Sequence, residues 1–413
     1  MKKLNLVFSV PILLFLTLIA RLLAFYFFAD NQLENEWMYL VHNLSEKGVL
    51  GINIVIDKNL ALPMLAQKEN IVLPSVFMPP LYSYIIYVIK FSVSNFTNYI
   101  NVILFLQIIL STITIYIFFK IIRMSESFKF SILSAYIFSF IPINIYSSVQ
   151  ISSISIQVFL IVYLFYIIKK FFLKKKSFNQ LIIFSFLSAM LILLRGEFIL
   201  FYFFTLVYLF IFFSRKINFI FISLVITSLL LSPYILRNYI NFNSFILTKS
   251  FGYNLLKGNN PEFKVEGNPE YIEKQFNRKD LNFEANNLYE IKLDDFYKDK
   301  SLEYIKDNKT SFVLNYLKKF FSFLFIDIDS SYSNYYNVLH ILPKIILSIA
   351  SILGGIILFR EKGFFQYLSF YFFSNILFFS IFFILPRYSL ILMPIQILLS
   401  VEFVKLLLRK FSN

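Results

Sequence analysis

The sequence contains no cysteine and few charged residues for its length. The absence of cysteine excludes disulfide bonds and thiolate metal sites in any compartment. The two histidines, His42 and His340, are too few and too far apart for a histidine metal cluster. Charged residues make up 15% of the 413 residues, against roughly 25% in an ordinary soluble domain. Hydrophobic residues make up 58% and the mean hydropathy is +0.70, so we predict an all-α polytopic membrane protein.

About ten apolar runs are long enough, or nearly so, to cross a hydrocarbon core of roughly 30 Å. Two of the expected spans end near residues 235 and 386, and the other eight cover about 5–28, 99–122, 130–147, 152–171, 180–194, 197–213, 338–359 and 388–408. The first run lacks a small-residue cleavage site and carries Arg21. We therefore expect it to stay in the protein as an anchor.

The net charge of +15 comes from basic residues that cluster in alternate connections between these runs. Such an alternation is what the positive-inside rule requires. It predicts a multi-pass protein of the plasma (inner) membrane with both termini in the cytoplasm. The charge is therefore explained by topology, and we expect no nucleic-acid partner.

This topology divides the chain into three regions. Residues 1–235 form an N-terminal transmembrane region with a first external loop over 29–98, residues 236–336 form a second external loop region, and residues 337–413 form the C-terminal transmembrane helices. Connections between spans can be much shorter than these loops, so we expect functional residues there. Each loop is predicted to carry a helix on the membrane surface, over 33–47 and over Phe312–Leu324.

Three carboxylates, Asp30, Glu34 and Glu36, follow the first span. Ionised groups next to hydrocarbon are costly, which makes them functional candidates. Helical spacing of apolar residues over 33–47 places Glu34 and Glu36 on opposite edges of one apolar stripe. The alternative is a solvated amphipathic helix whose acids only mark its polar edge. A divalent metal held by these acids is a further alternative, but their spacing does not define a metal site, and we expect no cofactor.

Four arginines, Arg21, Arg195, Arg237 and Arg387, are expected at the outer membrane boundary. A guanidinium can bind a phosphate through two parallel hydrogen bonds, so together they favour an anionic lipid headgroup as the ligand. Snorkelling to the headgroups is the alternative for Arg195 and Arg387. The second loop contains Gly258-Asn259-Asn260-Pro261. Its amides suit sugar hydroxyls, although such a sequence is first of all a turn.

In their order along the chain, these features resemble the GT-C superfamily of membrane glycosyltransferases, which includes protein O-mannosyltransferases and the bacterial lipid A aminoarabinose transferase. The resemblance covers nearly the whole length. Many members carry Asp-Glu or a lone Asp in the first loop, whereas this chain has Asp30 and then Glu34-Asn-Glu36, which leaves open which acid is the base. After this acidic loop, the matching segments are Pro79-Pro-Leu-Tyr82, Leu193-Leu-Arg195, Arg237-Asn-Tyr239, Gly252-Tyr-Asn-Leu255, Gly258-Asn-Asn-Pro261 and Pro386-Arg-Tyr388.

The resemblance implies an enzyme that moves a hexosyl or pentosyl group from a polyprenyl-phosphate donor to an external glycan, lipid or protein acceptor. Such a reaction needs cations at the leaving phosphate and a carboxylate that accepts the acceptor's proton. We assign Glu34 as first-choice base, Glu36 as alternate and Asp30 as helper, with inversion at the anomeric carbon. Donor phosphate binding is assigned first to Arg237 and Arg387 and then to Arg21 and Arg195. Sugar or acceptor binding is assigned to Tyr82, Tyr253, Asn254, Asn259 and Asn260.

Two other functions share part of this pattern. A transporter or flippase for lipid-linked sugars would bury charges along several spans and often show internal repeats. Here the spans are nearly free of charge and no repeat is evident. A polysaccharide polymerase or ligase shares the lipid-linked donor and the external loops, and the sequence does not separate it from a transferase.

Overall fold

The computed structural model describes residues 9–33, 35–57, 60–63, 70–93, 98–173, 177–212, 217–276, 281, 283–327, 329–330 and 338–412. Each of the ten predicted spans corresponds to one helix, or in one case to a pair of helices, in these ranges. Six described helices are long and apolar enough to cross a membrane: α2 (Val10–Phe28), α5 (Tyr99–Arg123), α8 (Ile154–Phe172), α11 (Ile217–Phe242), α16 (Val338–Leu358) and the run Pro386–Arg409, which contains most of α18 (Ser389–Ser412).

The other predicted spans are shorter apolar helices: α9 (Phe178–Leu194), α10 (Phe198–Phe212), α17 (Phe364–Phe379), and α6 (Phe128–Phe140) followed by α7 (Pro142–Ser147). The prediction of a helical multi-pass membrane protein is therefore confirmed. The number of ten spans stays a prediction.

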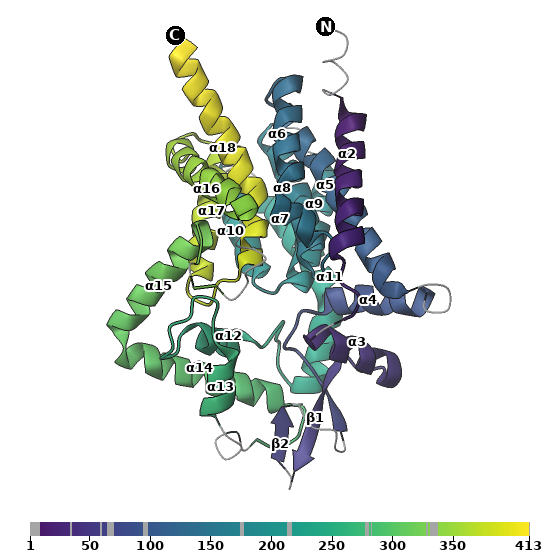
Figure 1. The fold of residues 1–413 in the computed structure, drawn as a ribbon. Coiled ribbons are helices and arrows are strands. Elements are labelled where there is room, and N and C mark those ends of the chain that lie inside the picture. Colours follow the sequence, from purple (N-terminus) through teal and green to yellow (C-terminus); the bar gives the residue numbers. More distant parts are fainter. Residues whose placement is uncertain are drawn as a thin grey trace.

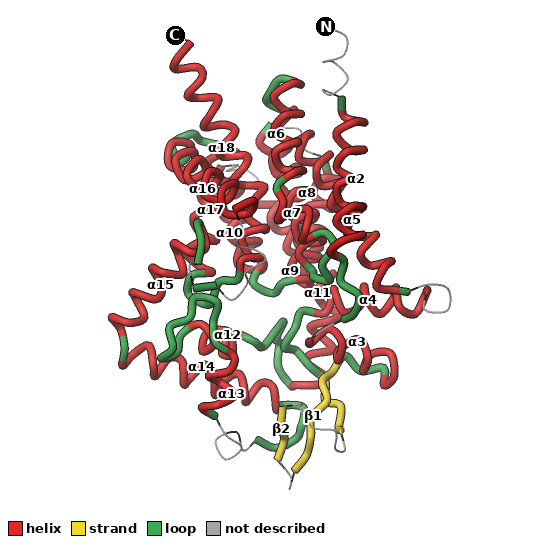
Figure 2. The backbone as a smooth tube through the Cα atoms, in the orientation of Figure 1, coloured by secondary structure: helices red, strands yellow, loops and turns green. Residues whose placement is uncertain are grey.

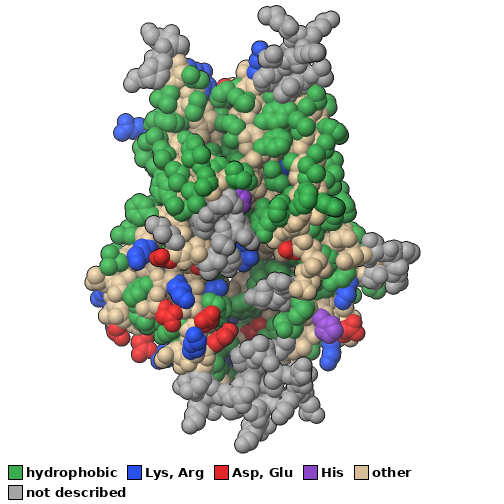
Figure 3. Space-filling model, in the orientation of Figure 1, with side chains coloured by type: hydrophobic (Ala, Val, Ile, Leu, Met, Phe, Trp, Pro, Cys, Tyr) green, Lys and Arg blue, Asp and Glu red, His purple; other side chains and the backbone are tan. Residues whose placement is uncertain are grey.

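Figure 1 shows α2 beginning and α18 ending at the same end of the molecule. The second loop region, with α12 (Phe251–Gly258), α13 (Pro269–Gln275) and α14 (Tyr289–Asp307), lies at the opposite end. Hydrophobic side chains cover most of the half in which α2 begins and α18 ends. Acidic and basic side chains gather on the half that contains α12, α13 and α14 (Figure 3). This is the division that a membrane-embedded bundle with a water-exposed part on one side requires.

The main hydrophobic core runs between α5, α8, α9, α17 and α18. Two glycines allow α16 to approach this core closely. A Cβ at Gly354 would overlap the Leu399 carbonyl of α18, and one at Gly355 would press on the Phe373 ring of α17. Small residues at such contacts are typical of helix packing in membranes, where close van der Waals contact drives association.

The first external loop contains a small sheet that the sequence analysis did not predict. Strands β1 (Gly51–Asp57), β2 (Leu60–Pro63) and β3 (Asn70–Pro74) form an antiparallel sheet in the order β2-β1-β3 (Figure 2). Val55 of β1 faces Leu62 on one side and Asn70 on the other. The β-branched run Ile54-Val-Ile56 favours a strand. The prediction of an all-α fold therefore holds for the bundle and not for this loop.

Helix α3 (Asn35–Lys47) confirms the helix predicted over 33–47. Its apolar stripe faces the protein, however, and not lipid. Leu40 and Leu44 are buried in a cluster with Leu50 and Tyr234, while His42 stays exposed on the polar face. The stripe is thus covered by the start of the sheet and by α11, which the sequence alone could not bring next to it.

Helix α11 continues beyond the point near residue 235 where its span was expected to end, with Pro233 inside it. Proline cannot donate to the carbonyl of the residue four positions earlier. The Ser232 hydroxyl donates to that carbonyl, of Leu229, at 2.9 Å and so satisfies it. Arg237 therefore lies on the helix, and the last turns of α11 reach into the half that contains the two loop regions (Figure 1).

Helix α15 (Lys309–Leu324) confirms the helix predicted over Phe312–Leu324. One face of it is apolar and exposed, with Val313, Leu314, Leu317 and Phe321 each 45–58% accessible. This amphipathic arrangement suits a helix that lies on a membrane surface.

Candidate functional site

Asp30 lies directly after α2, at the end of the bundle nearer the two loop regions. Its N–H donates to the Val149 carbonyl at 3.2 Å, and its Oδ2 accepts the N–H of Ile151 at 2.6 Å. Both partners follow α7, so the half-buried carboxylate is held between α2 and that segment. A carboxylate fixed in this way is oriented in advance for proton transfer, which is what a general base requires.

The other two predicted acids are not placed in the same way. Glu34 and the side chain of Glu36 lie outside the described residues. Their roles as first-choice and alternate base stay predictions, and Asp30 is the predicted acid whose carboxylate has described partners.

A hydrogen-bonded network that the sequence analysis missed surrounds Asp30. Gln107, in the middle of α5, donates to the Gln150 carbonyl at 2.8 Å and accepts the Tyr82 hydroxyl at 3.1 Å. Gln150 in turn donates to the Phe28 carbonyl at 2.8 Å. Asp30 is close enough to Tyr82 to act on it electrostatically. A glutamine inside an apolar span is the sequence signal that could have identified this network.

Tyr82, predicted to bind the sugar or acceptor, is fully buried at the start of α4 (Pro80–Val93). Its ring lies 4.9 Å from the Trp37 ring in a T-shaped contact, and its hydroxyl is bonded to Gln107. In this conformation Tyr82 joins α3 to α4 and α5. Its role in sugar or acceptor binding stays a prediction.

Arg195 and Arg387 come together where α9 ends and α18 begins. Arg195 caps α9, faces Glu197 across 3.9 Å, and places its guanidinium carbon 5.7 Å from the centroid of the Tyr388 ring. Arg387 precedes Tyr388 in the turn Pro386–Tyr388, and its side chain is exposed. Both arginines act electrostatically on Tyr388. Arg195 Nε is buried and makes no hydrogen bond among the described residues.

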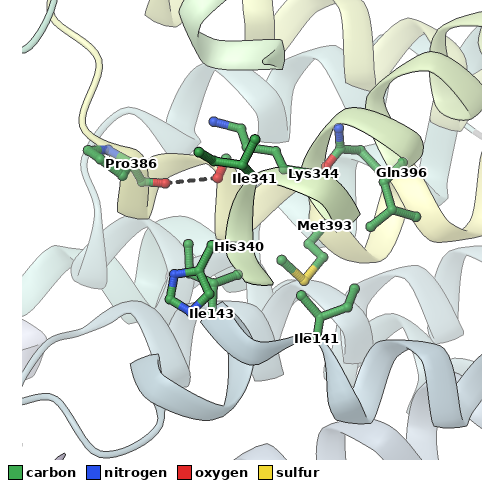
Figure 4. Close-up of a pocket in the computed structure, with 10 residues that line it drawn as sticks. Ile141, Ile143, His340, Ile341, Lys344, Pro386, Met393 and Gln396 are labelled. Atoms are coloured by element: carbon green, nitrogen blue, oxygen red, sulfur yellow. Dashed lines mark hydrogen bonds between the residues drawn. The ribbon is translucent and has the colours of Figure 1, made fainter. Parts of the chain in front are cut away.

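Beside this arginine pair lies a small cavity, with about 450 Å³ of space between its lining atoms when the adjoining open solvent is included. Figure 4 shows its walls, which come from the α6–α7 break, from α16 and from the start of α18. The lining is mainly apolar, and Lys344 and Gln396 are among its few polar side chains. Pro386 and Ser389, which flank Arg387 and Tyr388, also line it, and the Ser389 hydroxyl donates to the Pro386 carbonyl at 2.8 Å.

The short helix α7 connects Asp30 with this cavity. Ile141 and Ile143, at its beginning, line the cavity, and Val149 and Ile151, after its end, bind Asp30. The break that creates α7 follows from Pro142, which restricts Ile141 to an extended conformation. A carboxylate and a small, mainly apolar pocket therefore adjoin one segment of the chain.

Arg237 has a different environment from the other two external arginines. Its Nη2 donates to the Leu50 carbonyl at 2.6 Å and its Nη1 to the Ser75 carbonyl at 2.8 Å. Glu290, from α14, accepts the Ser75 hydroxyl and the Val76 N–H, both at 2.8 Å. We call this set the Arg237–Glu290 junction, because it ties the first external loop to the second. No described contact supports phosphate binding by Arg237, which stays a prediction.

Glu290 is a second residue that the sequence analysis missed. Burial raises its pKa to about 7, although the hydrogen bonds from Val76 and Ser75 and the charge of Arg237 favour the ionised form. The carboxyl group therefore changes its charge close to neutral pH, in the middle of the contact between the two loops.

Arg21 lies inside α2, fully buried. Its Nε donates to the Ser111 hydroxyl at 2.7 Å, and its Nη1 donates to the Thr17 and Ser139 carbonyls at 3.1 and 3.4 Å. These partners belong to α2, α5 and α6, and none of them is among the described residues around Arg387. The structure thus separates Arg21 from the arginine pair with which the sequence analysis grouped it.

The amides of Asn259 and Asn260 are bonded within the protein. Asn259 Nδ2 donates to the Leu255 and Ile381 carbonyls, both at 2.8 Å. Asn260 Nδ2 donates to two carbonyls of α12, and its Oδ1 accepts the Glu262 N–H at 3.1 Å. Both side chains are buried. The turn predicted from the sequence is confirmed, and the role of its amides in sugar or acceptor binding stays a prediction.

Tyr253 and Asn254 lie on α12 and are half-buried. The Tyr253 N–H donates to Asp294 Oδ1 at 2.9 Å, and its ring lies 5.6 Å from the Phe77 ring. Asn254 Nδ2 donates to the Ser250 hydroxyl at 3.5 Å. Their roles in sugar or acceptor binding stay predictions.

Among the described residues, no group of three or more His, Asp or Glu side chains is arranged to hold a metal ion. The side chains of Glu34 and Glu36 lie outside that part of the chain. The expectation that no metal is bound therefore stays a prediction.

The fold is similar to three solved structures of an oligosaccharyltransferase from Archaeoglobus fulgidus. The structure with Zn and sulfate has a TM-score of 0.53 and 11% identity, and the match covers 97% of this chain and 49% of that one. For the structure tethered to an acceptor peptide with the NVT sequon, these values are 0.54, 11%, 96% and 49%. For AglB with an inhibitory peptide and a dolichol-phosphate, they are 0.52, 12%, 96% and 50%.

The chain thus spans about half the length of these enzymes. At this identity the likeness shows the fold alone, and it supports the GT-C fold that the sequence resemblance implied. The narrower resemblance to O-mannosyltransferases or to the aminoarabinose transferase stays a prediction. No protein-family model and no curated protein matches the sequence.

Proposed function

We propose that this protein is a glycosyltransferase that moves a sugar from a polyprenyl-phosphate carrier to an acceptor on the outer side of the plasma membrane. The observation that carries the proposal is the arrangement around α7. A fixed carboxylate, Asp30, adjoins one end of this segment, and a cavity beside Arg195 and Arg387 adjoins the other. The fold adds support, because a similar structure contains a dolichol-phosphate.

Arg387 and Arg195 bind the donor phosphate in this proposal. Arg387 is exposed, and the buried Nε of Arg195 has no hydrogen bond among the described residues. Lys344 adds a third cation at the cavity wall, and its Nζ lies 3.4 Å from the Ser322 carbonyl. Cations placed at the phosphate stabilise the negative charge that develops as the sugar–phosphate bond breaks. The apolar cavity receives the adjoining part of the lipid.

Asp30 acts as the base, with Glu34 and Glu36 as alternates. The carboxylate accepts the proton of the acceptor hydroxyl or amine while that atom forms a bond to the anomeric carbon. The bond from this carbon to the phosphate oxygen breaks, and its electron pair stays on the lipid phosphate. One displacement without a covalent intermediate inverts the anomeric carbon. The Ile151 N–H holds the carboxylate in one orientation for this step.

Lipid analysis of cells that lack the gene tests this function. The unused donor should accumulate, so mass spectrometry of lipid extracts should show a polyprenyl-phosphate sugar that is scarce in the parent strain. Expression of the wild-type protein should remove it, and Asp30→Asn should not. Asp299→Asn, an exposed acid of α14, is the matched control and should behave like wild type. Equal levels of every polyprenyl-phosphate sugar in both strains would contradict the proposal.

The same complementation decides between the three acids. If Asp30→Asn restores normal lipid levels while Glu34→Gln or Glu36→Gln does not, the base is the acid whose variant fails.

A further inference from the structure

Helix α15 carries a lysine that is completely buried. Lys319 is 0% exposed, and its Nζ donates to Asn259 Oδ1 at 2.9 Å. Lysine is almost never fully buried without a partner, and burial lowers the pKa of Lys319 to about 7. An apolar side chain of similar length would fill the same space without desolvating an amine. The amine therefore has a task that packing alone does not explain.

Asn259 links Lys319 to the segment that leads to Arg387. Its Oδ1 faces Lys319, and its Nδ2 donates to the Leu255 carbonyl of α12 and to the Ile381 carbonyl. Ile381 lies between the end of α17 and the turn that contains Arg387. The amide therefore holds two parts of the chain together, and Lys319 fixes the orientation of that amide.

Further contacts hold the same segment from the same side. A Cβ at Gly258 would overlap the Phe382 carbonyl, so only glycine lets the two backbones approach there. The Ile384 N–H donates to the Val265 carbonyl at 2.9 Å. The backbone just before the turn Pro386–Tyr388 thus contacts the second external loop at Ile381, Phe382 and Ile384.

Helix α15 presents a second side chain to this contact. Asn315 is one turn before Lys319, so both lie on one face of the helix, and both are buried. Asn315 Nδ2 donates to the Gly258 carbonyl at 3.0 Å. On the other face, Leu314 and Leu317 are exposed. The inner face of α15 therefore supports the part of the second loop that binds residues 381–384.

We propose that Lys319 and Asn259 are positioning residues that fix the backbone of residues 381–388 and thereby the place of Arg387 at the donor phosphate. Neither side chain contacts the substrate, since both act through the backbone of the segment. The ligand in this inference rests on the proposed function, whereas the positioning itself involves protein contacts alone.

The absence of cysteine from the chain makes a direct test available. Arg387→Cys places a single thiol at the end of the positioned segment, and its rate of reaction with a membrane-impermeant thiol reagent reports how that segment is held. Adding Lys319→Met should change this rate severalfold in the purified protein. Lys318→Met, the exposed neighbour on the same helix, is the matched control and should leave the rate unchanged.

Asn259→Asp tests the bonds of Asn259 to Lys319 and to Ile381 separately, with a side chain of the same size. It keeps an acceptor for Lys319 and removes the N–H that binds Ile381. It should therefore change the labelling rate in the same direction as Lys319→Met, in a protein that elutes as a single peak on size exclusion. Labelling rates equal to those of the control in both variants would overturn the positioning role. This outcome does not depend on any enzymatic activity.

The second measurement is the donor dependence of transfer with Arg387 intact. Lys319→Met should raise the KM for a polyprenyl-phosphate sugar with little change in kcat, and Lys318→Met should match wild type. A changed labelling rate with an unchanged KM would overturn the link to the donor. Failure of the proposed function would look different, because the wild type itself would transfer no sugar while the labelling difference remained.

Discussion

Arg237 and Arg387 have the same guanidinium group but lie in different surroundings. The terminal nitrogens of Arg237 donate to the carbonyls of Leu50 and Ser75, in the contact with Glu290. Arg387 is exposed and makes no hydrogen bond through its side chain among the described residues. Sequence alone assigned both to the donor phosphate, because both follow apolar runs at a similar depth. The two arginines differ because Arg237 binds Ser75, which directly follows β3 and lies 162 residues away along the chain.

This difference predicts opposite effects for two substitutions. Arg237→Lys keeps the charge but cannot reach both carbonyls from one nitrogen, so the protein should lose thermal stability while the KM for the donor changes little. Arg387→Ala should raise the donor KM and leave the melting temperature near that of wild type. Thermal unfolding in detergent and transfer kinetics measure the two effects. A raised donor KM for Arg237→Lys, without a loss of stability, would return Arg237 to the phosphate site.

Among the elements, α14 and the end of β3 meet through Glu290. Its carboxyl group accepts the Ser75 hydroxyl and the Val76 N–H in a buried place. Arg237 and Glu290 therefore both bind the segment that follows β3. A small hydrophobic cluster of Leu73 and Tyr289 adds to this contact between the two loops.

The contact between these elements should weaken as the pH rises. The pKa of Glu290 is raised by burial from 4.5 to about 7, so the folded protein holds this proton more tightly than the unfolded chain does. The stabilisation is fully present below about pH 4.5 and is lost as the pH rises through about 7, which amounts to about 3 kcal/mol.

Thermal unfolding between pH 5 and pH 8 measures this effect. The wild type should lose stability over this range. Glu290→Gln, a neutral mimic whose Oε1 can still accept the Val76 N–H, should show a flatter profile, and the exposed Glu273→Gln should follow wild type. A wild-type profile that rises with pH, or one that Glu290→Gln does not flatten, would contradict this account of the junction.

The elements differ in how far the sequence predicts them. The spans are predictable because long apolar runs have no alternative to a helix in a membrane, and α3 and α15 follow from helical spacing. The sheet was missed because its strands are short and lie between two helices. The extension of α11 was missed because Pro233 predicts an end, and only the Ser232 hydroxyl bond shows how the helix continues.

The sequence predicts which types of residue form the site, but it does not predict which of these residues lie close together. Asp30 and the two outer arginines stand out in sequence because charges are rare beside apolar runs. Glu290 and Lys319 did not, because their roles depend on partners far away in the chain, such as Ser75 for Glu290 and Asn259 for Lys319. Burial of Tyr82, Asn259 and Asn260 likewise depends on the packing of separate elements.

For the whole molecule, the arrangement of charge and apolar surface predicts one orientation. Single cysteines introduced at Glu46 and Asp299, both exposed on the loop half, should react with an impermeant thiol reagent added to intact cells. A cysteine at Lys362, exposed between α16 and α17, should react only after the membrane is opened. Labelling in the opposite pattern would place the loops in the cytoplasm, where nucleotide sugars are available, and would remove the argument for a lipid-linked donor.

The central claim is that the protein breaks the sugar–phosphate bond of a lipid-linked donor with Asp30 as the base. The most direct measurement follows donor lipid with purified protein in liposomes that contain the lipid extract of cells lacking the gene. Wild type with its acceptor should convert the accumulated polyprenyl-phosphate sugar to polyprenyl phosphate, and Asp30→Asn should slow this at least ~100-fold, as expected for loss of a general base. Donor that moves between leaflets but stays intact with wild-type protein would contradict the claim and favour a flippase.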